Sequence, residues 1–432
     1  RAATDPAARI GTLVINPGGP GGSGVNAVLA GGFDDELGRH FDLLGFDPRG
    51  VGGSSPVLCS LDLLNQVSST ITSQAEFDRT VAASRALADD CRSRSGPVFD
   101  HVDTVQTVGD IDAIRAAVGD GQLSFFGMSY GTLMAHQYAE RFPDRVRAIV
   151  ADSNMDHSLD ASGFATTGAA TDQDTFNEFV TGCGQIPTCA LYGRDIRQFW
   201  TRLLERAGRG ELPDPDDPGY RIHPAELSNY VIGALNYGPY WVGVASELRR
   251  LDEGRPSGQS TTPTPPPSGL IVNFVYQATM CQDWNLGTTT YAAWRTIMNG
   301  VDATAPDLPG LSRPRVGAIC LGWPTAATNP PHRIVATNTT KLLLVNSRHD
   351  PATGYQWAQG TAAQFGGRAV LLTYQGWGHI AYGRTACVDA AIDRYLVDRE
   401  PPAPGSSCAA VPPEGAPTSA RRSASAASPA GA

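Results

Sequence analysis

The segment Gly127-Met-Ser-Tyr-Gly131 has the spacing that presents one serine hydroxyl for nucleophilic attack. An apolar run, 123–126, precedes it, and a segment of helical character, 132–142, follows at once. This order predicts a strand that turns sharply into a helix, with Ser129 at the apex and small residues two positions to either side. Among 48 glycines a chance match is the alternative, but the flanking strand and helix favour a nucleophile elbow whose helix N-terminus faces the hydroxyl.

A serine nucleophile needs a base and an acid that orients the base, each on a loop after a later strand. Asp350 follows the apolar run 341–345, and His379 follows the run 369–373 in a glycine-rich loop. His349 is the competing base, but its position next to Asp350 on one loop would point the two side chains apart. We therefore predict a triad of Ser129, His379 and Asp350.

The glycine-rich run 17–24 can supply backbone N–H groups to a developing oxyanion, because glycine lets the backbone approach a substrate carbonyl. We predict the amide of Gly19 as one donor, with Gly18 as the alternative. The second predicted donor is the amide of Tyr130, the residue after the nucleophile.

The same run also fits the Gly-x-Gly-x-x-Gly pattern of a dinucleotide site, with Asp47 where a ribose-binding acid would lie. Pro20 removes an amide that a pyrophosphate would need, and a dinucleotide site leaves the serine, aspartate and histidine series unexplained. We therefore expect no cofactor. No His/Cys spacing suits zinc, so we expect no metal either.

The segments that must position these residues alternate between strands and helices. Strands are predicted at 11–16, 41–46, 123–126, 146–151, 341–345 and 369–373, and helices at 75–92, 103–118, 132–142, 353–365 and 386–396. This rhythm is typical of an α/β protein with a mostly parallel sheet that helices cover on both faces.

The alternation stops between 157 and 335. Short amphipathic helices are predicted there at 176–180, 196–207, 224–235 and 240–251, with a Pro/Ser/Thr/Gly-rich loop at 254–269. We predict a core formed by 1–156 and 336–408, a largely helical cap inserted at 157–335, and a disordered Ala/Ser/Pro-rich tail at 409–432.

The overall charge argues against two classes of partner. The 432 residues carry a formal net charge of −10 without a basic run, so we do not expect the protein to bind nucleic acid. No apolar run reaches the roughly 18 residues of a membrane-spanning helix, so we expect no membrane span.

The eight cysteines are even in number and contain no Cys-x-x-Cys pair. In chain order they form local pairs, which we predict as the disulfides Cys59–Cys91, Cys183–Cys189, Cys281–Cys320 and Cys387–Cys408. Four disulfides indicate an exported protein in an oxidising environment, with buried free thiols in a cytosolic enzyme as the alternative.

These pieces together resemble the α/β-hydrolase peptidases of the prolyl-iminopeptidase type and, more closely, the secreted tripeptidyl aminopeptidases of actinobacteria. The matching segments are 16–24 (Asn-Pro-Gly-Gly-Pro-Gly-Gly-Ser-Gly), 41–54, 127–131, Asp350, Gly378-His379, and the pair Cys387 and Cys408. The similarity covers residues 10–157 and 335–408 well, and the cap less well.

The resemblance implies an α/β-hydrolase fold and a serine peptidase that acts through an acyl-enzyme and releases short peptides, such as tripeptides, from free amino termini. A carboxylesterase or lactonase with the same triad is the alternative, so the substrate is a peptide or a small ester. Acidic cap residues hold the substrate ammonium in this family, for which Glu178 and Asp283 are candidates here. Trp241, with Tyr240, is the candidate for an apolar subsite, and aromatic packing in the core of the cap is the alternative.

The chain departs from the family at its start. Members carry additional strands before the one that corresponds to 11–16, whereas ten residues precede it here. We therefore expect a preceding segment, signal peptide included, in the complete protein, and the loss of two edge strands is the alternative.

Overall fold

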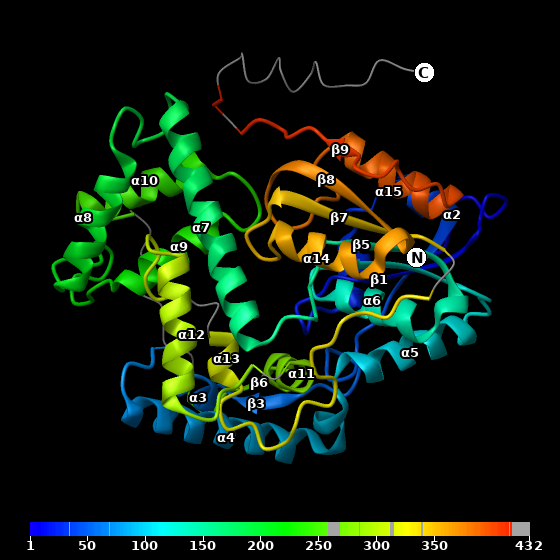
Figure 1. The fold of residues 1–432 in the computed structure, drawn as a ribbon, viewed down its shortest axis with the longest axis horizontal. Helices are drawn as coiled ribbons and strands as arrows, with labels where there is room; N and C mark the ends of the chain where they lie inside the picture. Colours follow the sequence, from blue (N-terminus) through cyan, green and yellow to red (C-terminus); the bar gives the residue numbers. More distant parts are fainter. Residues whose placement is uncertain are drawn as a thin grey trace.

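The protein is described by a computed structural model that covers residues 1–33, 35–68, 70–257, 268–284, 286–311, 315–337, 340–413 and 415–416. Its centre is a seven-stranded sheet in the order β2-β1-β4-β5-β7-β8-β9, in which every pair of neighbours is parallel (Figure 1). In that order the strands are Phe41–Gly45, Gly11–Asn16, Leu123–Met128, Val146–Asp152, Leu342–His349, Ala369–Trp377 and Ser407–Cys408. The predicted parallel sheet is confirmed.

Helices cover both faces of the sheet, as alternate residues of β1 show. Leu13 and Ile15 pack in one apolar cluster with helices α1 (Gly24–Ala30), α2 (Asp35–His40) and α15 (Ala386–Asp398). Val14 points the other way, into a second cluster with α5 (Thr104–Ala117), α6 (Gly131–Arg141) and α14 (Tyr355–Phe365). The sheet is therefore buried on both faces, which explains why its strands are continuous apolar runs.

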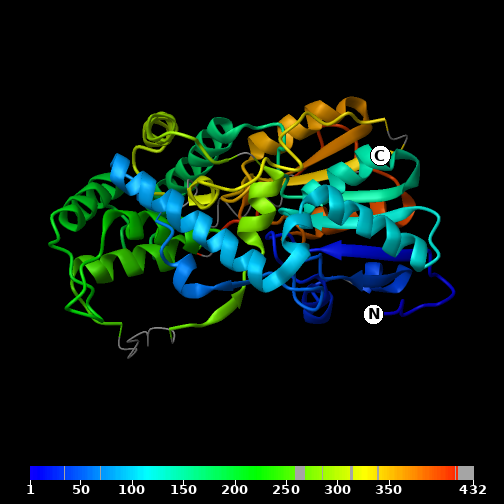
Figure 2. The same ribbon diagram turned by 90° about the horizontal axis from the view of Figure 1, so that it is seen from below.

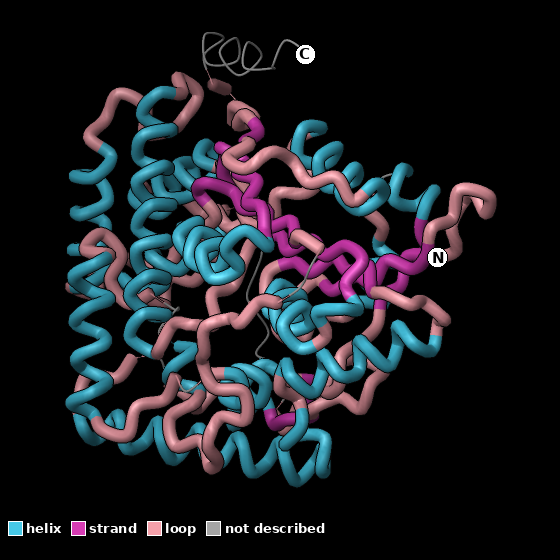
Figure 3. The backbone as a smooth tube through the Cα atoms, turned by 45° about the vertical axis from the view of Figure 1, so that its right-hand side comes forward, coloured by secondary structure: helices cyan, strands magenta, loops and turns pink. Residues whose placement is uncertain are grey.

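A separate group of helices packs around its own apolar cluster beside the sheet (Figure 1). These are α7 (Ala161–Gln185), α8 (Ile196–Gly208), α9 (Pro224–Ala234), α10 (Trp241–Asp252) and α12 (Tyr291–Thr304). Figure 3 shows that strands are confined to one part of the molecule, apart from one short pair. The prediction of a short helix at 176–180 is wrong, because that segment lies inside the 25-residue helix α7. Small residues such as Ala, Gly and Thr dominate the first half of α7, so its helical period is weak in sequence.

Parts of the first 156 residues pack against the segment predicted as the cap. Strand β3 (Leu58–Ser60) pairs antiparallel with β6 (Ile271–Asn273), and the adjoining helices are α3 (Leu61–Leu64) and α4 (Gln74–Ser95). Helix α4 contacts α11 (Tyr276–Asp283) and α13 (Arg315–Ile319) on the cap side (Figure 2). Both strands of this pair have three residues, too short to produce a pattern in the sequence.

All eight cysteines are paired as predicted, and none is free. The disulfides are Cys59–Cys91, Cys183–Cys189, Cys281–Cys320 and Cys387–Cys408. Within the described ranges, no helix is long and apolar enough to cross a membrane. Most of the predicted tail, 417–432, lies outside the described residues.

The disulfide Cys387–Cys408 joins α15 to the edge strand β9 across a sequence separation of 21 residues. Replacing both cysteines by serine should lower the free energy of unfolding by about 3 kcal/mol, because the unfolded chain regains the entropy of an open loop. Chemical denaturation under non-reducing conditions measures this loss. An unchanged unfolding midpoint would contradict a stabilising role for this disulfide.

Candidate active site

Ser129 lies at the tight turn between β4 and α6, at the carboxyl edge of the sheet. Its backbone φ is +55°, a left-handed conformation that costs a non-glycine residue about 1–3 kcal/mol. The amide of Ser129 donates to the carbonyl oxygen of Asp152 at 2.9 Å, which ties the turn to the end of β5. The predicted strand-turn-helix context of Ser129 is therefore present.

The structure gives a steric reason for each glycine around this turn. A Cβ atom on Gly127 would lie 2.3 Å from the carbonyl oxygen of Gly131, and one on Gly131 would lie 2.7 Å from Oδ1 of Asn16. A Cβ on Gly18 would lie 2.8 Å from the amide nitrogen of Tyr130. The loop after β1 thus touches the turn after β4 at van der Waals distance, and no side chain fits between them.

The amides around this contact differ in what they bind. Gly18 N–H donates to Oδ1 of Asn16 at 2.9 Å, so the alternative oxyanion donor is already occupied. Among the described residues, the amides of Gly19 and Tyr130 donate to no protein acceptor. Asp47, the residue that a dinucleotide site would require, accepts from Ser23 Oγ at 2.5 Å and from Gly53 N at 2.9 Å, and so closes its own loop.

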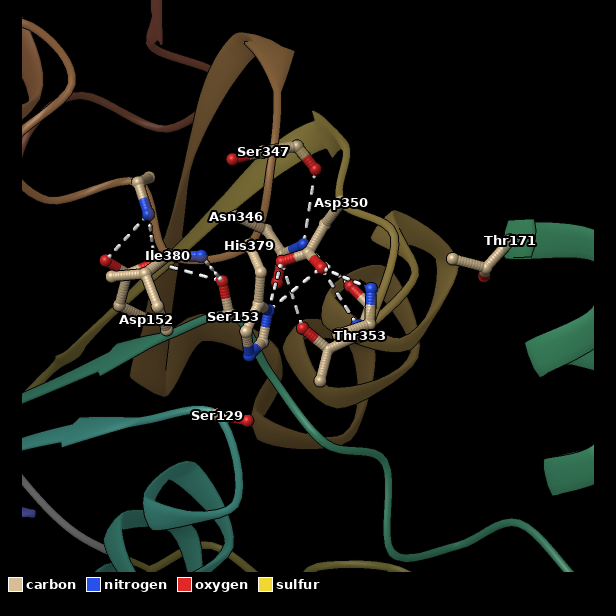
Figure 4. A network of polar contacts seen from close by, with 12 residues as sticks. Ser129, Asp152, Ser153, Thr171, Asn346, Ser347, Asp350, Thr353, His379 and Ile380 are labelled. Carbon is tan, nitrogen blue, oxygen red and sulfur yellow. Dashed lines mark hydrogen bonds and ion pairs between the residues drawn. The ribbon is translucent and has the colours of Figure 1, made fainter. Parts of the chain in front are cut away.

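His379 and Asp350 meet at the same edge of the sheet (Figure 4). Nδ1 of His379 lies 3.0 and 3.1 Å from the two carboxylate oxygens of Asp350. Asp350 is fully buried and also accepts from the amides of Ala352 and Thr353, both at 2.9 Å. Burial alone would raise the pKa of Asp350, but the His379 imidazole and hydrogen bonds from Ser153 and Thr353 outweigh it and lower that pKa.

Ser129 lies on the side of the imidazole away from Asp350 (Figure 4). No hydrogen bond joins its hydroxyl to His379 within the described part of the chain. Such contacts are often long in a protein without substrate and tighten in the Michaelis complex. The imidazole of His349 has a different partner. Its Nδ1 lies 2.8 Å from Oδ2 of Asp174 on α7, so His349 does not compete for Asp350.

A cavity of about 780 Å³ lies between the loop that follows Asp350 and the helices α7 and α9. Pro351 and Ala352, which follow Asp350, form part of its wall. Asn236, another wall residue, accepts the amide of His379 through its carbonyl at 2.8 Å. The wall is mainly apolar, and Asp172 is the only charged side chain among its described residues: Leu64, Asn65, Val67, Asp172, Asn229, Ile232, Gly233, Asn236, Phe274, Tyr276, Leu311, Val316, Ile319, Pro351 and Ala352.

The prediction that Asp283 binds substrate is wrong. Its side chain is fully buried beneath the turn, where it accepts from Tyr130 Oη and from the amide and hydroxyl of Thr104, both at 2.8 Å. Asn329 Nδ2 donates to it at 2.6 Å. Burial raises the pKa of Asp283 to about 6, although these hydrogen bonds act in the opposite direction. Asp283 thus fixes the Tyr130 side chain and has no access to a ligand.

Trp241 does not line the cavity either. Its indole is buried inside the cap against Gly182 and the ring of Trp377, so the subsite prediction for Trp241 is wrong. Tyr240 is 60% exposed and lines a different surface groove. Glu178 accepts from Trp377 Nε1 at 2.8 Å and lies 3.9 Å from His349 Nε2, outside the described wall of the cavity.

Asp172 is a residue of the cavity wall that the sequence did not lead us to predict as a candidate for substrate binding. It lies on the buried face of α7, in register with Gly168, Thr175, Phe176 and Phe179. An acidic residue at an inward-facing position of an amphipathic helix is an unusual pattern, because a charge is rarely buried without a function or a partner. That pattern was available in the sequence once α7 was recognised as one long helix.

The raised pKa of Asp283 predicts a pH-dependent stability. The folded protein holds this proton more tightly than the unfolded chain, so the linked stability is full below the usual carboxyl pKa of 3.8 and is lost as the pH rises through about 6. Between about pH 5 and pH 7, wild type should therefore lose about 1 kcal/mol more than Asp283→Asn. Denaturation curves at the two pH values measure the difference. The exposed-site variant Asp302→Asn should follow wild type, and parallel losses in all three proteins would contradict the prediction.

Comparison with known proteins agrees with this geometry. A family described as TAP-like protein matches residues 312–408. Serine protease Hip1 of Mycobacterium tuberculosis is 30% identical over 93% of this chain and 81% of its own. Carboxylesterase B of the same organism is 32% identical over 93% and 80%, and tripeptidyl aminopeptidase of Streptomyces lividans is 27% identical over 93% and 77%.

Among solved structures, an α/β-hydrolase fold protein from Nakamurella multipartita aligns with 91% of this chain and 94% of its own, at 14% identity and a TM-score of 0.37. The matches to the sequence relatives cover 93% of this chain, at up to 32% identity. The chain therefore belongs to the α/β-hydrolase family of serine hydrolases that contains these mycobacterial and Streptomyces enzymes.

Proposed function

We propose that Ser129, His379 and Asp350 form the catalytic triad of this serine hydrolase. The observation that carries the proposal is the contact of His379 Nδ1 with the buried Asp350 carboxylate, at 3.0 and 3.1 Å. This contact fixes the ring tautomer that leaves Nε2 as the proton acceptor. The steric need for glycine on both sides of Ser129 supports its assignment as the nucleophile.

In this mechanism the Ser129 hydroxyl attacks the substrate carbonyl while His379 Nε2 takes its proton. The amides of Gly19 and Tyr130 stabilise the oxyanion that develops. The leaving group departs with the proton from His379, and an acyl-enzyme remains on Ser129. Water, deprotonated by His379, then releases the acyl group and regenerates the serine.

We propose further that the substrate is a peptide with a free amino terminus. Asp172 adds a carboxylate to the mainly apolar wall of the cavity, and a negative charge on such a wall favours a cationic group of the substrate. Relatives named serine protease and tripeptidyl aminopeptidase support a peptide substrate. The second candidate is a carboxylic ester, which the relative named carboxylesterase B supports. The triad chemistry is the same for both.

We propose that the protein works outside the cytoplasm. All eight cysteines are consumed in disulfides, and disulfides persist in oxidising compartments.

The nucleophile assignment predicts covalent labelling at one position. A fluorophosphonate probe should label wild type, and Ser129→Ala should not be labelled, because the probe reacts only with an activated serine hydroxyl. Gel fluorescence and the mass of the labelled peptide measure this. Ser347→Ala, a change at another buried serine, is the matched control and should keep the label at Ser129. A label that persists in Ser129→Ala would disprove the assignment.

The role of Asp172 predicts a preference for free amines. Asp172→Asn should lower kcat/KM for a peptide anilide with a free amino terminus by about 10- to 100-fold, the effect of losing one charge-assisted hydrogen bond. Turnover of the acetylated anilide and of a small neutral ester should change little, because neither carries an ammonium. Equal turnover of free and acetylated anilides by wild type would instead favour the esterase.

A further inference from the structure

The loop that carries His379 is held by Asp152, the last residue of β5, and by Ser153, the residue that follows the strand. The three residues after His379 direct consecutive backbone amides toward Asp152 and Ser153 (Figure 4). Ile380 N donates to Ser153 Oγ at 2.9 Å. Ala381 N lies 3.0 Å from both carboxylate oxygens of Asp152, and Tyr382 N donates to the same carboxylate at 2.9 Å.

Asp152 also holds the nucleophile turn, but with a different atom. Its backbone carbonyl accepts the amide of Ser129 at 2.9 Å. One residue therefore contacts the loop of the nucleophile through its main chain and the loop of the base through its side chain. Asp152 therefore links the two loops directly through its own main-chain and side-chain atoms.

This arrangement lowers the stability of the folded protein, because it buries a carboxylate without a cationic partner and holds two residues in a left-handed conformation. Asp152 and Ser153 are both fully buried, and no described arginine, lysine or histidine forms an ion pair with Asp152. The nearby charged groups are Asp350 and His379. Burial raises the pKa of Asp152 to about 6, even though the amides of Ala381 and Tyr382 act to lower it. Ser153 and Ile380 both adopt a left-handed φ, of +67° and +66°.

We propose that Asp152 and Ser153 are positioning residues that hold the imidazole of His379 at its working distance from Ser129. Neither touches substrate: Asp152 acts through the backbone amides of Ala381 and Tyr382, and Ser153 acts through the amide of Ile380 and through its hydrogen bond to Asp350. Packing alone would not require three consecutive amides to meet a buried carboxylate and a strained serine, whereas a fixed loop orientation does. The inference rests on the proposed catalytic role of His379.

The first test is Asp152→Asn, which keeps the shape of the side chain but replaces one carboxylate oxygen by an NH2 group. This group cannot accept the backbone amides of Ala381 and Tyr382. The expected result is a fall in kcat of about 100-fold with KM unchanged, because a small displacement of the base affects the transition state and not the binding of substrate. Asp120→Asn is the matched control, since Asp120 also accepts a backbone amide, that of Thr12 at 2.9 Å, at another place in the sheet. It should keep full activity.

The second test separates positioning from stability. Ser153→Gly removes both the acceptor of Ile380 N–H and the hydroxyl that donates to Asp350, but it relieves the left-handed strain, since glycine adopts a φ of +67° freely. The variant should be at least as thermally stable as wild type and yet label more slowly with a fluorophosphonate probe, by about 10-fold or more. This variant also keeps the proposal testable if Asp152→Asn does not fold.

Different outcomes would overturn the proposed function of the protein and the positioning role of Asp152 and Ser153. Failure of wild type to label at Ser129 would overturn the proposed function itself. Normal labelling of wild type together with unchanged kcat in Asp152→Asn, or an unchanged labelling rate in Ser153→Gly, would overturn only the positioning role. A loss of activity matched by an equal loss in Asp120→Asn would also overturn it.

Discussion

The catalytic edge of this protein depends on one close approach of backbone to backbone, between the loop after β1 and the turn after β4. The sheet order makes β1 and β4 neighbours, so the two loops leave the sheet side by side. Side chains are excluded at Gly18, Gly127 and Gly131 because a Cβ at any of them would lie within 3 Å of a neighbouring backbone or side-chain atom. The same approach brings Gly18, from the loop after β1, against Ser129 and Tyr130, although the two loops are far apart in sequence.

Three buried carboxylates lie near this edge, and their pKa values differ because their hydrogen-bond partners differ. Asp350 faces an imidazole and has a lowered pKa, whereas Asp152 and Asp283 face amides and hydroxyls and have raised pKa values. Only the first is paired with a group that can carry positive charge. Neutral donors satisfy the hydrogen-bonding capacity of the other two without offsetting the full cost of burying their charge.

The sequence predicted the sheet and the triad because both leave local patterns. Doubly buried parallel strands are continuous apolar runs, and each of Ser129, Asp350 and His379 follows one of them. The cap left weaker patterns, since Ala, Gly and Thr in α7 pack closely without a strong apolar period. Asp283 shows a further limit: its sequence neighbours resemble those of a surface acid, and only the fold reveals that Tyr130 and Thr104 enclose it. Asp152 gave no pattern at all, because its partners are backbone amides more than 200 residues away.

The distribution of the disulfides has a consequence for how such enzymes diverge. Two of them lie within 157–335, one within the preceding segment and one within the following segment, so none joins the inserted segment to the rest of the chain. Substitutions, insertions or deletions in that segment can reshape the cavity without leaving an orphaned cysteine elsewhere. The covalent framework therefore lets the residues of 157–335 vary separately from the sheet.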